Sequence, residues 1–160
     1  MKTLLVISDT HGNKAAVDAL LPRVEENDYV VHLGDGFADY REIFANYPKK
    51  AYLCRGNCDG YAALPEEGVL EIERVRIFYC HGHSYGVKSD LSRLAYRAKE
   101  LDCAVALYGH THTPLISDVG GVTLINPGSL RFPLHQGGSY AYVVIHGEKV
   151  TATLVGNPLR

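Results

Sequence analysis

Residues 2–13 read KTLLVISDTHGN, and this stretch changes character twice along its length. Lys2 to Ser8 is a continuous apolar run of β-favouring residues, which predicts a strand. The polar group Asp9-Thr10-His11 ends the run, and Asn13 is suited to cap a following helix. The apolar positions of that helix recur at helical spacing and are Ala16, Ala19 and Leu20. The stretch therefore predicts a strand, a loop and a helix in that order.

The next part of the chain continues this alternation. Tyr29 to Leu33 repeats the strand signal, Asp39 to Ala45 is weakly helical, and Lys50 to Arg55 is a third strand candidate. Short strands that alternate with helices indicate right-handed βαβ units and a parallel sheet. The fold class predicted for this part is α/β.

A hairpin and a strongly amphipathic helix come next. Val69 to Glu73 and Val75 to Cys80 are strand-like runs with almost nothing between them, which predicts an antiparallel pair. The pattern is helical from Ser89 onward, and Ala104 to Tyr108 reads as a further buried strand. The apolar face of the predicted helix consists of Leu91, Leu94, Ala95, Ala98 and Leu101.

From Pro114 onward the sequence predicts strands and no helix. Gly-rich turns separate the predicted strands, which are Leu115 to Val119, Val122 to Asn126, Tyr140 to His146 and Val150 to Val155. No repeat, low-complexity tract or Pro/Ser-rich linker divides residues 1–160. We therefore expect a single domain, in which the α/β part and the β-rich tail share one core as two sheets face to face.

Composition excludes several classes of protein. The chain has 160 residues and a formal charge of -2, which predicts no stable binding to nucleic acid or to an anionic membrane. Its apolar runs are far shorter than the roughly 20 residues of a membrane helix, and no export signal is visible. The four cysteines lack the density of a disulfide scaffold and C-x-x-C spacing, so a cytoplasmic location is expected.

Polar clusters follow the predicted strands at five places. Each cluster directly follows an apolar run, and ligands bind beyond the carboxyl ends of strands in open α/β sheets. Segments distant in sequence could therefore converge on one site. The clusters are Asp9-Thr10-His11, Gly34-Asp35, Gly56-Asn57-Cys58-Asp59, His81-Gly82-His83 and Gly109-His110-Thr111-His112.

The residue types in these clusters are ligands for divalent metals. Carboxylate, imidazole and amide donors suit Mn, Fe, Zn, Ni or Co, whereas softer sites use thiolate. There are too many candidates for one tetrahedral ion. With one carboxylate as a bridge, they could hold two ions about 3.5 to 4 Å apart.

Taken singly, these residues have simpler interpretations. Asp9 or Asp35 alone would more often be a turn or cap residue, and Asn57 and Asp59 could be turn formers. A lone His83 or His135 would more often be a hydrogen-bonded loop residue, and His32, inside a strand run, is expected to be a satisfied core histidine. The joint occurrence of two H-x-H pairs and one D-x-H, all just after strands, is what favours a metal site.

The ordered series of motifs resembles the calcineurin-like metallophosphoesterase superfamily, specifically its small bacterial and archaeal branch of YfcE-type phosphodiesterases. The motifs run from Asp9 to His112, and Asn126-Pro127-Gly128-Ser129 extends the likeness. The resemblance implies the metallo-dependent phosphatase fold, a four-layer α/β/β/α sandwich with two facing mixed β-sheets. It also implies that Asp9, His11 and His112 hold one metal, that Asp35 bridges, and that Asn57, His81 and His110 hold the other.

Two positions depart from the superfamily pattern. Cys58 stands where many members have a His that is proposed to assist the leaving group, so Asp59, His83 or a metal-bound water is a candidate for proton transfer. His83 is alternatively a residue that faces the substrate. Many members also have an acidic residue three positions after the bridging Asp, where this chain has Ala38 and then Asp39.

The resemblance implies hydrolysis of a phosphodiester by a metal-bridging hydroxide, with two divalent ions as cofactors. Mn is the first choice of metal, with Ni, Zn, Fe and Mg as alternatives, and a small phosphorylated molecule is the expected substrate. The alternatives are a phosphomonoesterase, a hydrolase of another bond, and a non-catalytic metal-binding module for protein interaction. A homo-oligomer is left open. A short chain leaves little sequence for a cap, so we expect a shallow, open cleft.

Overall fold

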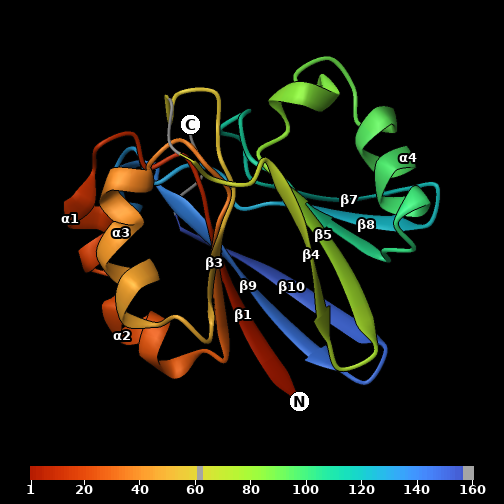
Figure 1. The fold of residues 1–160 in the computed structure, drawn as a ribbon, viewed down its shortest axis with the longest axis horizontal. Coiled ribbons are helices and arrows are strands. Elements are labelled where there is room, and N and C mark those ends of the chain that lie inside the picture. Colours follow the sequence, from red (N-terminus) through yellow and green to blue (C-terminus); the bar gives the residue numbers. More distant parts are fainter. Residues whose placement is uncertain (61–62, 157–160) are drawn as a thin grey trace.

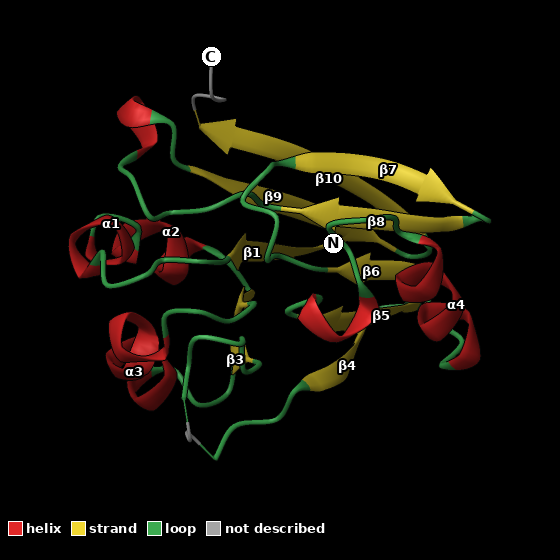
Figure 2. Ribbon diagram, turned by 90° about the horizontal axis from the view of Figure 1, so that it is seen from above, coloured by secondary structure: helices red, strands yellow, loops and turns green. Residues whose placement is uncertain are grey.

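Two β-sheets pack against each other with helices on their outer sides (Figure 1). The computed structural model describes residues 1–60 and 63–156. Figure 2 shows α1 (Lys14–Asp18), α2 (Leu21–Glu26) and α3 (Phe37–Asn46) on one side of the strands and α4 (Ser92–Glu100) on the other. The strands are β1 (Lys2–Ile7), β2 (Tyr29–His32), β3 (Ala51–Leu53), β4 (Glu67–Ile72), β5 (Val75–Cys80), β6 (Val105–Leu107), β7 (Leu115–Val119), β8 (Val122–Asn126), β9 (Ser139–His146) and β10 (Lys149–Gly156).

Each sheet has five strands and mixes parallel with antiparallel pairs. The first sheet has the order β10-β9-β1-β2-β3, with β1, β2 and β3 parallel and β9 antiparallel to β1. The second has the order β4-β5-β6-β8-β7, with a parallel centre of β5, β6 and β8 and antiparallel edges. The predicted βαβ units and the β4–β5 hairpin are confirmed.

Three apolar clusters hold four layers together. One lies between the sheets and includes Leu4, Val6 and Val143, the second joins the first sheet to α1, α2 and α3, and the third joins the second sheet to α4. Side chains alternate along β1: Leu4 and Val6 face the other sheet, whereas Leu5 and Ile7 face the helices. Both faces of β1 are buried, which explains its unbroken apolar run. The predicted α/β/β/α sandwich is therefore confirmed.

The structure corrects the helical segments in detail. The helical segment after Asn13 divides at Ala19 and Leu20 into α1 and α2, with Pro22 in the first turn of α2. Asn13 caps α1 as predicted, because its Oδ1 accepts from the Ala16 amide. Leu20 is buried as predicted, whereas Ala19 is exposed, and Val17 and Val24 complete the buried face. The helix predicted from Ser89 begins at Ser92, because the Asp90 carboxylate accepts from the Ser92 amide at 2.8 Å and forms a turn there. Within described residues 114–156 the only helical element is a 3₁₀ turn, Leu134–Gln136.

His32 is a core histidine, as predicted. It is only 1% exposed at the end of β2, and its two ring nitrogens contact the Gly34 amide at 3.1 Å and Thr10 Oγ1 at 3.0 Å. Burial is the largest influence on the ring, and it lowers the pKa of His32 to about 4 although nearby carboxylates oppose the shift.

Stability of the metal-free protein is expected to fall as pH falls below 6.5, because unfolded His32 then takes up a proton that the folded state refuses. A folded pKa of about 4 predicts that the free energy of unfolding drops by about 2 kcal/mol between pH 7 and pH 5 from this residue alone. Urea unfolding at the two pH values measures the drop. His32→Gln, which cannot titrate, should show a correspondingly flatter profile, and equal slopes in both proteins would contradict this account.

No helix in the described part of the chain has the length and apolarity needed to cross a membrane.

Candidate metal centre

The polar clusters that follow β1, β2, β3, β5 and β6 meet at one end of the sandwich, as the sequence predicted. His, Asp and Cys side chains from all five of these loops form three groups, and within each group the nitrogen, oxygen or sulfur atoms all lie within 4.8 Å of one another. The groups are Asp9, His11 and His112; Asp35, His81 and His110; and His11, Asp35 and Cys58.

The backbone of these loops is strained. In the described part of the chain seven non-glycine residues have a positive φ, and five of them are candidate ligands. Positive φ is uncommon outside glycine and concentrates at functional sites, where the surrounding structure enforces it. The five are Asp9 (53°), His11 (44°), Asp35 (62°), His110 (70°) and His112 (63°).

The first group is arranged around one oxygen of Asp9. Oδ2 of Asp9 accepts hydrogen bonds from Ser8 Oγ at 2.5 Å and from the His110 amide at 3.0 Å. Oδ1 is buried without a hydrogen-bond partner, and it lies 3.2 Å from His112 Nε2 and 3.5 Å from His11 Nε2. One oxygen therefore fixes the carboxylate, while the other faces the imidazoles with its lone pairs unused.

The second group is arranged in the same way around Asp35. Its Oδ1 accepts from the Cys58 amide at 2.7 Å, and its Oδ2 lies 3.2 Å from His81 Nε2. Nδ1 of His81 is 2.8 Å from the Leu33 carbonyl, so Nδ1 donates and Nε2 keeps its lone pair for the site. Nε2 of His81 is also 3.2 Å from His110 Nδ1.

Asp35 faces both groups. Besides its contact with His81, its Oδ2 is 3.8 Å from His11 Nε2, which belongs to the first group. The bridging role implied by the resemblance therefore agrees with its position.

The ionisation of the cluster favours a bound cation. Burial alone would raise the pKa of Asp9 and Asp35, but the nearby His112 and His81 lower the pKa of Asp9, and His81 lowers the pKa of Asp35. Burial would lower the pKa of His81, yet these carboxylates raise it. Burial and the charge of His81 lower the pKa of His110. Two ionised carboxylates at 0% and 3% exposure need compensating positive charge, which a proton on His81 supplies in part when no metal is bound.

Spacing provides the test of whether metal ions fit these residues. Two imidazole nitrogens bound to one ion at metal distances of about 2.0 to 2.1 Å lie roughly 3.0 to 3.4 Å apart. The His11 and His112 Nε2 atoms are 3.1 Å apart, and the His81–His110 pair is separated by 3.2 Å. Together with the unpartnered Asp9 Oδ1, these spacings fit two ions.

Asn57 and Cys58 lie on the turn after β3, and both are exposed. Nδ2 of Asn57 is 3.4 Å from Cys58 Sγ. This contact does not involve the other candidate ligands, so the ligand role of Asn57 stays a prediction. Cys58 belongs to the third group, with His11 and Asp35. Partial burial and the charge of Asp35 raise the pKa of the Cys58 thiol, so it is uncharged at neutral pH.

Asp59 anchors backbone. Its carboxylate accepts from the amides of Asp35, Gly36, Phe37 and Gly56 at 2.7 to 3.1 Å. Partial burial would raise the pKa of Asp59, but these four bonds lower it. An ionised carboxylate with four donors is a poor proton donor, so its contacts favour a role in holding the Asp35 loop.

His83 is half-buried beside the second group, with its ring centre 5.4 Å from that of His81 and 6.2 Å from that of His110. Its Nδ1 is buried without a hydrogen-bond partner. Burial and the charge of His81 lower the pKa of His83, so the ring is neutral at pH 7. His135 lies in the 3₁₀ turn Leu134–Gln136 and in none of the three groups.

Three residues support the site although the analysis of single motifs gave them no role. Ser8 binds Asp9, Nδ2 of Asn126 donates to the Gly109 carbonyl at 3.2 Å, and Ser129 Oγ donates to the Asp9 carbonyl at 2.6 Å. Gly109 is required by close approach, because a Cβ there would lie 2.2 Å from Ser8 Oγ. The Asn-Pro-Gly-Ser motif at the end of a predicted strand was the available signal for Asn126 and Ser129.

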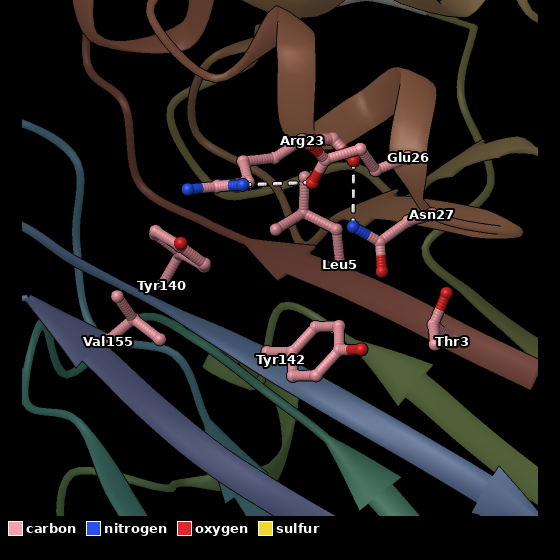
Figure 3. A pocket seen from close by; sticks show the side chains of 8 residues that line it. All are labelled: Thr3, Leu5, Arg23, Glu26, Asn27, Tyr140, Tyr142 and Val155. Carbon is pink, nitrogen blue, oxygen red and sulfur yellow. Dashed lines mark hydrogen bonds and ion pairs between the residues drawn. The ribbon is translucent and has the colours of Figure 1, made fainter.

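A groove of about 360 Å³ runs beside the cluster and is open to solvent, in agreement with the expected shallow cleft. It is lined by His11, Gly12, residues 35–39, Cys58 and Asp59. A separate pocket of about 330 Å³ lies between α2 and the outer face of β1, β9 and β10 (Figure 3). None of the candidate ligands lines that second pocket, whose walls include Arg23, Tyr140 and Tyr142.

Comparisons with known proteins agree with this geometry. Residues 1–149 match the model of the calcineurin-like phosphoesterase superfamily domain. Probable metallophosphoesterase YsnB from Bacillus subtilis is 32% identical over 92% of this chain and 87% of its own length. Phosphodiesterase YfcE from Escherichia coli is 30% identical, with 88% and 85% covered.

Solved structures show the same fold. A predicted phosphoesterase from Streptococcus pneumoniae superimposes with a TM-score of 0.81 at 29% identity, covering 97% of this chain and 89% of that one. Vacuolar protein sorting 29 from Cryptosporidium parvum has a TM-score of 0.76 at 19% identity, with 98% of each chain covered, and shares the fold alone. The chain therefore belongs to the calcineurin-like phosphoesterase superfamily, a family of metal-dependent hydrolases.

Proposed function

We propose that this protein is a two-metal phosphodiesterase. The observation that carries the proposal is the pair of buried carboxylates, each with one oxygen fixed by protein donors and the other turned towards imidazole nitrogens. Asp9, His11 and His112 would hold one ion, Asn57, His81 and His110 the other, and Asp35 would bridge them. Mn is the proposed metal. Such ions polarise phosphoryl oxygens and activate water near neutral pH.

The chain's own residues fix the geometry of this chemistry. Asp59 and Asn126 hold the Asp35 loop and the 109–111 loop, so the ligands need little rearrangement when the site is filled. The open groove beside Asp35 gives room for the substrate phosphate. Such preorganisation places polar groups where charge develops in the transition state.

We assign the contact with the leaving group to His83 rather than to Asp59. Neutral His83 can donate a hydrogen bond to the leaving oxygen. The Asp59 carboxylate, in contrast, is ionised and already accepts hydrogen bonds from four backbone amides. A neutral imidazole is a weak acid, so diesters with good leaving groups should react fastest.

Cys58→His is expected to raise the hydrolysis of diesters with poor leaving groups by at least about tenfold, because an imidazolium at this position can protonate the leaving oxygen. Cys58 lies within 4.8 Å of ligand atoms of His11 and Asp35, so the new ring is near the reacting phosphate. The kcat values of alkyl and nitrophenyl diesters measure the effect. Cys58→Ser is the matched control, and an equal gain in both variants would contradict proton donation.

A non-catalytic interaction module remains the alternative, since Vps29 shares the fold. Every ligand position implied by the resemblance carries a coordinating side chain in this chain, which favours the enzyme. The test is hydrolysis of bis(p-nitrophenyl) phosphate and p-nitrophenyl phosphate by metal-stripped protein with Mn, Ni, Zn or Mg added back. We expect Mn to restore the cleavage of the diester above that of the monoester. Metal binding without hydrolysis of either compound would favour the interaction module.

A further inference from the structure

Three buried polar side chains form a chain of hydrogen bonds beneath the metal centre. Thr10, His32 and Asp39 are 0%, 1% and 6% exposed. Oγ1 of Thr10 is 3.0 Å from His32 Nε2 and 2.6 Å from Asp39 Oδ2. None of the three is a candidate ligand, and they come from three different segments of the chain.

The direction of the bonds in this chain is fixed by its two ends. Nδ1 of His32 accepts from the Gly34 amide at 3.1 Å, so the neutral ring carries its proton on Nε2 and donates it to Thr10 Oγ1. The Thr10 hydroxyl then donates to Asp39 Oδ2, which also accepts the Gly12 amide at 2.9 Å. Each polar hydrogen along this path is donated in one hydrogen bond, so every donor in the network has an acceptor.

The network ties together the two loops that carry the carboxylate ligands. Thr10, in the middle of the network, lies between Asp9 and His11 in sequence, and Asp39 at one end accepts from the Gly12 amide of the same loop. At the other end, His32 accepts a hydrogen bond from the amide of Gly34, the residue before Asp35. Gly36 packs closely against the middle of the network: a Cβ at this position would lie 1.8 Å from Thr10 Oγ1 and 2.9 Å from His32 Nε2.

The hydrogen-bond network is needed because the candidate ligands on both loops have unfavourable backbone conformations. Asp9, His11 and Asp35 have φ values of 53°, 44° and 62°, which persist only when neighbouring contacts enforce them. A buried polar network in which every bond is made is rigid and specific.

We propose that Thr10, His32 and Asp39 are positioning residues, which hold Asp9, His11 and Asp35 in place for metal binding. The proposal rests on the proposed two-metal function. Residues that orient metal ligands commonly contribute 10- to 100-fold to metal affinity, without touching the metal themselves.

The test titrates Mn²⁺ into metal-stripped protein and measures free Mn²⁺ by electron paramagnetic resonance. Thr10→Val removes the hydroxyl at nearly constant shape, Thr10→Ser restores it, and Asp39→Ala removes the acceptor if the valine variant does not fold. Thr151→Val, on an exposed position of β10, is the matched control for hydroxyl loss. Thermal unfolding of each metal-free variant shows that it is folded.

Wild type, Thr10→Ser and Thr151→Val are expected to bind two Mn²⁺ ions. Thr10→Val and Asp39→Ala should remain cooperatively folded but bind at least one ion about 10- to 100-fold more weakly. Wild-type affinity and stoichiometry in both folded variants would overturn the proposal, as would equal losses in Thr10→Ser and Thr10→Val. If the wild-type protein binds no Mn²⁺, the proposed function itself fails, and that result is distinct from a difference between variants.

Discussion

Asp35→Asn is expected to lower phosphodiester hydrolysis by about 1000-fold or more while the protein stays folded. Asp35 Oδ2 lies 3.2 Å from His81 and 3.8 Å from His11, so its charge would serve both halves of the proposed centre. An amide keeps the shape of the side chain but removes the negative charge that a bridging ligand supplies. Loss of several kcal/mol of transition-state stabilisation corresponds to a factor of this size.

The measurement is kcat/KM for bis(p-nitrophenyl) phosphate at saturating Mn²⁺, with bound metal counted on the same samples. Asp18→Asn is the matched control, because Asp18 is an exposed residue of α1 paired with Lys14. The variant at Asp35 should lose activity and metal together. Activity within tenfold of wild type would show that Asp35 does not bridge the ions.

Removal of metal is expected to lower the midpoint of thermal unfolding by about 10 °C. Ions that bind only the folded state add about 4 kcal/mol at 1000 times their dissociation constant, and each kcal/mol is worth roughly 2 to 4 °C in a domain of this size. Bound ions also compensate the buried charges of Asp9 and Asp35. Calorimetry with EDTA and with excess Mn²⁺ measures the shift.

The size of this shift should increase with pH. The raised pKa of His81 stabilises the metal-free fold at low pH, and that contribution is lost as pH rises through the folded pKa. Metal binding requires the deprotonated ring, so its contribution grows over the same range. The Mn²⁺-induced increase in midpoint should therefore be larger at pH 8 than at pH 6. An increase that is constant or smaller at pH 8 would contradict the assignment of His81 as a ligand.

Local patterns were sufficient to predict most of the elements, but not all of their neighbours in space. β1 has an unbroken apolar run because both of its faces are buried, and α4 has one apolar face because only that face packs against a sheet. The antiparallel pairing of β9 with β1 joins residues such as Val143 and Leu4, and no local signal specifies it. The start of α4 was missed by three residues, because a turn formed by Asp90 replaced its first turn.

The candidate ligands could be predicted because metals demand particular donor atoms, and these donors follow strands. The supporting roles could not. Asp59 reads as a turn former or a proton donor in sequence, and only the folded chain brings the four amides that it binds within reach. Thr10 and Asp39 are separated along the chain, so their 2.6 Å hydrogen bond depends on how α3 packs beside the β1 loop.

The most direct test of the two-metal account is a stepwise titration of metal-stripped protein with Mn²⁺, in which bound metal and diester hydrolysis are measured together. The account predicts that two ions bind per chain and that hydrolysis appears only as the second one binds, because both groups around Asp35 must be filled. Full activity with one bound ion, or two bound ions without hydrolysis, would contradict it.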